Sequence, residues 1–159
     1  MSLQKSYVEA GTDILYCPTF TANSIKLAEY GLADKQNEMI CDLVSSSKEA
    51  ASSAERQVLI AGDLTMTGKQ LAPVGTMEFE ELIEVYKEQI LCLKEAGVDL
   101  IVVETMMSMQ EARAALIAAK ECCELPVMVT MTFEKDGRTL FGTDALTAAV
   151  CLEKLGADA

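Results

Sequence analysis

Four short apolar runs occur along the chain at intervals that suit alternating strands and helices. They occupy Asp13–Pro18, Gln57–Ala61, Asp99–Val103 and Pro126–Met131. Each run is continuously apolar and does not alternate with polar residues, which is typical of parallel strands covered on both faces. The pattern therefore predicts four buried, parallel strands.

Between these runs, apolar residues recur three and four positions apart, as in amphipathic helices. Phe79–Ala96 shows the pattern best, with glutamates and lysines on the opposite face. The same spacing predicts helices over Met109–Cys123 and Ala145–Leu155. Ser24–Glu55 is long, and a change of phase near Gly31 indicates two helices there. With a further helix at the start, the order is a helix followed by four strand–helix units, so the fold class is α/β.

A short repeat joins helix ends to strand starts. It occurs as Gly11-Thr12-Asp13, Gly97-Val98-Asp99 and Gly156-Ala157-Asp158. Glycine suits the left-handed position that ends a helix, and the aspartate then opens a strand. The third copy predicts another strand where the sequence stops, so we expect an internal fragment of a larger fold.

A series of strand–helix units forms either an open, doubly wound sheet or a barrel. A doubly wound nucleotide-binding fold should carry a Gly-x-Gly-x-x-Gly or P-loop motif after its first strand. Neither motif is present, since Gly62 and Gly68 stand alone. This favours a partial TIM (β/α)8 barrel with about four parallel strand–helix units, filling residues 1–159 as one domain.

Composition restricts the partners and the compartment. The net charge of −12 over 159 residues argues against nucleic acid and against a membrane surface, because both require clustered basic residues. No apolar segment reaches the roughly 18 residues of a membrane span. The six cysteines lie in apolar segments without a common spacing, which indicates reduced thiols and a cytoplasmic protein.

The chain contains no histidine, the commonest general base and the commonest metal ligand. Cys17 lies at the end of the first predicted strand but has no histidine to activate it as a nucleophile. Cys122 and Cys123 lie at a helix end without a third ligand, so zinc is not expected there. We predict neither a catalytic residue nor a metal ligand within this sequence.

Polar residues at strand ends are the candidate binding groups. Glu104 directly follows a strand, where barrel sites are built, and its carboxylate suits a substrate ammonium; the alternative is a structural contact with a neighbouring loop. Thr105 lies beside it. Backbone amides of the segment from Gly62 to Gly68 suit a carboxylate, unless this is an ordinary loop. Asp63 within it and Thr19 after the first strand complete the candidates.

Four sets of residues, in order, resemble the homocysteine S-methyltransferase family. Glu104-Thr105-Met106 is similar to its fourth strand–helix unit. The remaining matches are Ala10–Ile14 with Pro18-Thr19-Phe20 for the second unit, Ala61-Gly62 with Thr67-Gly68-Lys69 for the third, and Pro126–Val129 with Gly142-Thr143-Asp144 for the fifth. The N-terminal homocysteine-binding modules of cobalamin-dependent methionine synthases are the most similar in style. The chain is thus expected to hold units two to five and to end at the start of strand six.

The resemblance implies that the parent protein transfers a methyl group to the homocysteine thiol, forming methionine. In the family, zinc held by three cysteines activates the thiolate. The first of these cysteines follows the sixth strand, and a Cys-Cys pair lies near the eighth. All three would lie outside this sequence, so the fragment alone is expected to be inactive. Cobalamin would be bound by other domains of the parent. Glu104 matches the carboxylate that holds the substrate amine.

Departures from the family pattern leave alternatives open. Relatives often carry Glu-Thr-Asn where this chain has Tyr16-Cys17-Pro18, and serine where it has Asp63. The methyl donor could therefore be betaine or S-methylmethionine, or the parent could be a corrinoid-dependent demethylase. A non-catalytic binding or assembly module is the alternative outside enzymes. The open edges of a partial barrel would also allow a homo-oligomer in which two chains close a pseudo-barrel.

Overall fold

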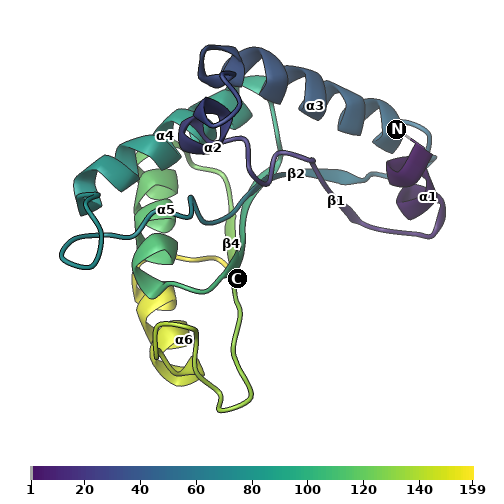
Figure 1. Ribbon diagram of the computed structural model, residues 1–159. Coiled ribbons are helices and arrows are strands. Elements are labelled where there is room, and N and C mark those ends of the chain that lie inside the picture. Colours follow the sequence, from purple (N-terminus) through teal and green to yellow (C-terminus); the bar gives the residue numbers. More distant parts are fainter. Residues whose placement is uncertain (1) are drawn as a thin grey trace.

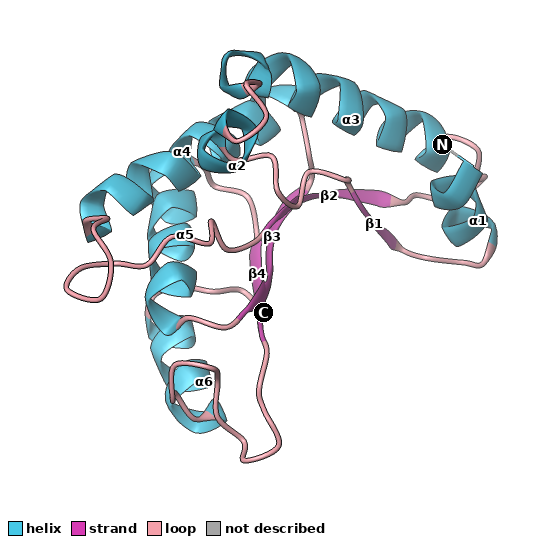
Figure 2. Ribbon diagram, viewed as in Figure 1, coloured by secondary structure: helices cyan, strands magenta, loops and turns pink. Residues whose placement is uncertain are grey.

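The computed structural model describes residues 2–159 and consists of one curved parallel sheet with helices along its outer side (Figures 1 and 2). The four strands lie in the order β1-β2-β3-β4, and each pairs in parallel with the next. Their bounds are β1 Ile14–Tyr16, β2 Leu59–Leu64, β3 Leu100–Met106 and β4 Val127–Met131. The predicted partial barrel of four strand–helix units is confirmed.

The helices also follow the expected order. Their bounds are α1 Ser2–Glu9, α2 Ser24–Ala28, a 3₁₀ turn η1 at Ala33–Lys35, α3 Gln36–Ala51, α4 Phe79–Ala96, α5 Met109–Cys122 and α6 Ala145–Lys154. The division of the long helical segment near Gly31 is confirmed, because α2 ends just before this glycine and η1 and α3 follow it. Within residues 2–159, no helix is both long enough and apolar enough to cross a membrane.

Two strands extend further than the sequence indicates. β2 continues through Gly62 and Asp63, which pair with Ile101 and Val102 of β3. These two residues were expected in a loop, because glycine and aspartate are poor strand formers. Pairing with a neighbouring buried strand overrides that local preference. β3 likewise includes Glu104 and ends only at Met106.

Gly62 is needed where β2 meets helix α4. A Cβ atom at this position would lie 2.9 Å from Cδ1 of Leu93, a fully buried residue of α4. Carbon atoms pack comfortably at about 3.5–4.0 Å, so a side chain here would force the Leu93 side chain or its helix to shift. The glycine therefore allows close packing between strand and helix.

The sheet separates two apolar layers. The larger layer lies between the strands and the helices. The smaller one covers the concave face and consists of Ala61, Leu100 and Val102 together with Ile14, Tyr16, Leu59 and Met128. Side chains alternate between the faces of a strand. Asp63 therefore continues the concave row of Leu59 and Ala61, and Glu104 continues the row of Leu100 and Val102.

The repeated Gly-x-Asp motif ties adjacent strands together. The Asp99 N–H donates to the Ile60 carbonyl at 2.8 Å, and the Asp99 carboxylate accepts the Ile60 N–H at 2.7 Å. Asp158 makes the same pair of bonds with Val127, at 2.9 and 2.8 Å. The last residues thus hydrogen-bond to β4 in the manner of a further strand.

Candidate functional site

Two acidic side chains meet on the concave face, at the carboxyl ends of β2 and β3. Asp63 is only 5% exposed, and its Cα is paired with that of Val102. Glu104 lies two residues further along β3, on the same face. The two carboxyl groups interact, and a side-chain hydrogen bond to Glu104 is one of the causes that raise the pKa of Asp63. A sheet register set by apolar residues therefore brings together two acids that lie far apart in the sequence.

The environment of Asp63 favours its neutral form. Burial and then the adjacent Glu104 carboxylate raise the pKa of Asp63 to about 8. Burial disfavours a charge, and a nearby like charge adds to that effect. At neutral pH the Asp63 carboxyl therefore keeps its proton, which forms the hydrogen bond to Glu104. The Asp63 Oδ1 atom has no hydrogen-bond partner within residues 2–159.

The backbone beneath the carboxyl pair is held by buried hydroxyl groups. The Thr19 hydroxyl donates to the Asp63 carbonyl at 2.8 Å and accepts the Asp63 N–H at 3.1 Å. The Thr65 hydroxyl donates to the Glu104 carbonyl at 2.8 Å. Gln89 of α4 in turn donates to the Thr19 carbonyl at 2.9 Å. Thr19 therefore positions Asp63, while direct contact of Thr19 with a substrate stays a prediction.

Tyr16 is a third polar group at this site, and the sequence analysis overlooked it. Its pKa is raised by burial first, and then by the charges of Glu104 and Asp63. Tyr16 pairs with Ala61, two residues before Asp63, and belongs to the concave layer. β1 is only three residues long, too short for its alternation to reveal which side chain faces the concave side.

Thr105 and Cys17 differ from each other in exposure: Thr105 is exposed and Cys17 is buried. Thr105 is exposed and has a left-handed backbone (φ +58°), beside a bulge between Val103 and Met106. Such a φ is rare for a β-branched residue. Its N–H donates to the Thr130 hydroxyl at 3.1 Å. Cys17 is buried, and burial above all raises the pKa of its thiol to about 11. It is therefore a packed thiol, and its burial disfavours the thiolate form.

Two backbone amides of the segment Gly62–Gly68 are already bound within the fold. The Asp63 N–H is bound by Thr19, and the Thr67 N–H donates to the Glu111 carboxylate at 2.8 Å. The Lys69 N–H donates to the Thr67 hydroxyl at 3.2 Å. Of the backbone amides from Gly62 to Gly68 predicted to hold a substrate carboxylate, those of Asp63 and Thr67 are therefore already occupied.

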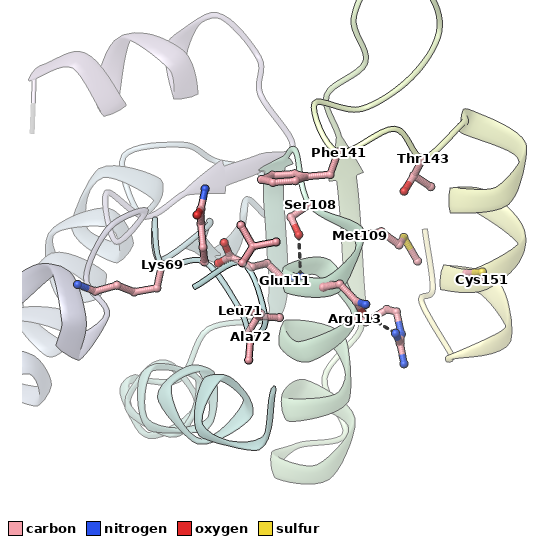
Figure 3. Close-up of a pocket in the computed structure, with 13 residues that line it drawn as sticks. Lys69, Leu71, Ala72, Ser108, Met109, Glu111, Arg113, Phe141, Thr143 and Cys151 are labelled. Atoms are coloured by element: carbon pink, nitrogen blue, oxygen red, sulfur yellow. Dashed lines mark hydrogen bonds between the residues drawn. The ribbon is translucent and has the colours of Figure 1, made fainter. Parts of the chain in front are cut away.

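A cavity of about 500 Å³ lies apart from the carboxyl pair (Figure 3). It is formed by the loop after β2, the start of α5, the loop before α6, and Cys151 of α6, and none of the four predicted site residues lines it. Glu111 at its base is 4% exposed, and it also accepts the Tyr86 hydroxyl at 3.0 Å and the Thr67 hydroxyl at 3.1 Å. Glu111 therefore fastens the loop after β2 to α4 and α5.

The residues at hand do not fit a metal centre. Within residues 2–159, no three histidine, cysteine or acidic side chains gather closely enough to hold an ion. Cys122 and Cys123 lie at the end of α5, and all six cysteines are free thiols. What the carboxyl pair offers a ligand is hydrogen-bond acceptors and negative charge.

Solved structures and curated proteins resemble this chain over almost its whole length. The metallated form of the homocysteine methyltransferase MmuM from Escherichia coli superposes with a TM-score of 0.83 at 16% identity, covering 98% of this chain and 58% of that one. The oxidized form gives 0.82 at 19% identity, covering 96% of this chain and 56% of that one. These likenesses establish the fold.

Among curated proteins, the methionine synthase of Mycobacterium tuberculosis is 26% identical over 165 residues, which cover 99% of this chain and 14% of that protein. The methionine synthase of Mycobacterium leprae matches with the same values. The chain thus spans about a seventh of these relatives. The sequence model of the homocysteine S-methyltransferases matches residues 1–159. The chain therefore belongs to the homocysteine S-methyltransferase family, as its resemblance indicated.

Proposed function

We propose that this chain forms part of the homocysteine-binding face of an enzyme that transfers a methyl group to the homocysteine thiol and so produces methionine. The buried Asp63–Glu104 pair at the carboxyl ends of β2 and β3 is the observation that carries the proposal. Membership of the methyltransferase family supports the reaction class.

The chemistry of the pair suits the amino-acid end of homocysteine. An ammonium group offers three N–H donors, and the pair offers a carboxylate on Glu104 and the unpartnered Oδ1 of Asp63. Charge-assisted hydrogen bonds of this type are about twice as strong as neutral ones. Glu104 would hold the ammonium, with Asp63 as a second contact and Thr19 holding Asp63 in place. Thr105 is the outermost of these four and would lie at the mouth of the site.

Activation of the thiol is assigned to groups outside this chain. In the transfer, the thiol loses its proton, a new sulfur–carbon bond forms, and the bond between the methyl group and its donor breaks. Histidine, the commonest general base, is absent from the sequence, and the Asp63–Glu104 pair is assigned to the ammonium group. We infer a zinc ion held by residues of the parent that lie outside this sequence, with a cobalamin-linked methyl donor bound by its other domains.

The state of the cysteines indicates the cellular compartment. All six cysteines are free, which supports a reducing compartment. We infer that the parent protein acts in the cytoplasm on a small-molecule substrate.

Binding measurements on the purified chain test the proposal. L-Homocysteine is titrated calorimetrically into the wild type, into Glu104→Gln and into Glu55→Gln. Glu55 is an exposed glutamate before β2, at the opposite end of the sheet, and serves as the matched control. Loss of one charge-assisted contact, about 1.5–3 kcal/mol, weakens binding roughly tenfold or more in Glu104→Gln. The control retains wild-type affinity.

Equal affinity of wild type and Glu104→Gln would refute the assignment of Glu104. In a full-length parent, Glu104→Ala should raise the KM for homocysteine by roughly tenfold or more, and an unchanged KM would count against the proposal in the same way.

A further inference from the structure

We infer that Asp63 and Glu104 form a proton-exchanging ammonium site: the empty pair holds one proton between its two carboxyl groups, and the incoming ammonium displaces that proton to solvent. The inference rests on the proposed function and adds a property to it, namely that substrate binding is linked to pH through Asp63.

The geometry supports a shared proton. Asp63 and Glu104 project from paired strands onto the same concave face, and two carboxyl groups that meet there can hydrogen-bond to each other only when one of them carries a proton. Asp63 is only 5% exposed, and its Oδ1 atom has no hydrogen-bond partner in the described part of the chain. A buried oxygen without a partner costs about 1–3 kcal/mol, which a ligand N–H group would recover.

The groups that face Asp63 are acidic or neutral. From β3 comes Glu104; from β1 and its following residue come Tyr16 and Cys17, whose own pKa values are raised in part by Asp63. Helix α4 contributes the uncharged Gln89, through Thr19. Lys48 of helix α3 acts to lower the pKa of the Cys17 thiol. It is not among the groups that shift the pKa of Asp63. The ligand must therefore supply the positive charge.

Ammonium binding exchanges one cation for another. The proton leaves the Asp63 carboxyl for water, and both carboxylates then accept N–H bonds from the ligand. An opposite charge within about 4–6 Å lowers the pKa of a carboxyl group by about 1–3 units. Starting from about 8, Asp63 in the complex would titrate between roughly pH 5 and pH 7. The complex therefore holds fewer protons than the free protein.

Linkage then fixes the size of the effect. Near pH 7, roughly 0.4–0.9 proton leaves for each ligand bound, and affinity rises roughly 5- to 50-fold between about pH 6 and about pH 8. The chain has no histidine, so no other side chain with an ordinary pKa titrates in this range.

Calorimetry in two buffers of different ionisation enthalpy measures the proton directly. L-Methionine is the probe, because it has the same ammonium and carboxylate groups as homocysteine and no thiol to titrate. Near pH 7 the wild type is expected to release roughly 0.4–0.9 proton for each L-methionine bound. Asp63→Asn, which mimics the protonated side chain, is expected to bind with no proton release and with nearly constant affinity. Asp63→Ser provides a second neutral variant should the first fail to fold.

The outcomes separate this inference from the proposed function. Binding of L-methionine and L-homocysteine without proton release, and with affinity independent of pH, overturns the inference alone. Absence of binding by both amino acids overturns the proposed function and the inference together. Proton release that persists in both Asp63 variants assigns the proton to another group and likewise refutes the inference.

Discussion

Replacing Asp63 with asparagine should stabilise the fold, by an amount that grows with pH. Asparagine has nearly the same shape as a protonated aspartic acid and can donate its N–H to Glu104. The wild type, by contrast, must either keep a proton on Asp63 or bury a second negative charge. The change therefore removes an ionisation penalty and leaves the packing intact.

The magnitude follows from the pKa difference between the folded and unfolded states. Asp63 titrates at about 8 in the folded protein, and an unfolded aspartate titrates at about 3.9. The folded state holds the proton from about pH 4 to about pH 8, where the unfolded state has lost it, so stability falls as pH rises through this range. Each pKa unit corresponds to about 1.36 kcal/mol, which gives a total of roughly 5 kcal/mol at pH 8.

Urea unfolding at about pH 5, 6, 7 and 8 measures this effect, because the absence of histidine leaves no other side chain with an ordinary pKa in this range. The difference in unfolding free energy between Asp63→Asn and the wild type should increase by about 1.4 kcal/mol per pH unit. Asp42→Asn, at an exposed position on α3, should show no such slope. A constant difference for Asp63→Asn across the range would refute the reasoning.

Other substitutions and the open sheet edges give further predictions. Glu111→Ala leaves the buried Thr67 N–H without its acceptor and leaves the Tyr86 hydroxyl only the Thr65 carbonyl, so urea unfolding should show a loss of roughly 1–3 kcal/mol; a loss below about 1 kcal/mol would contradict this interpretation of the cluster. Gly62→Ala places a methyl group against Leu93 and should cost about 1–3 kcal/mol, and the double variant with Leu93→Ala should lose less stability than the sum of the two single losses; additive losses would count against the contact. The purified chain should self-associate in sedimentation experiments, because the outer edge of β1 is unpaired within residues 2–159; a stable monomer would remove this prediction.

The sequence predicted the elements well where the apolar pattern was long. The bounds of α4 agree with the prediction at both ends, because its apolar stripe continues over its whole length and Gly97 ends it in a left-handed conformation (φ +77°). Strand ends were predicted less well. Gly62 and Asp63 lie in β2 only because β3 pairs with them, and local composition carries no trace of a partner strand.

The candidate site could be predicted only in part. Asp63 and Glu104 were identified separately, from their places at strand ends. That their carboxyl groups touch depends on the register between β2 and β3, which the alignment of two separate apolar runs sets in space. The shift in the pKa of Asp63 depends on burial by the folded chain. Tyr16 was missed because a three-residue strand shows no alternation.

The central claim, that the acidic pair recognises an ammonium group, is tested most directly by removing that group from the ligand. Homocysteine is compared with 4-mercaptobutanoate, which lacks the ammonium, and with 3-amino-1-propanethiol, which lacks the carboxylate, by calorimetric titration of the wild-type chain. Loss of the ammonium should weaken binding roughly tenfold or more, while loss of the carboxylate should have a smaller effect. Binding of 4-mercaptobutanoate as tight as that of homocysteine would contradict the claim.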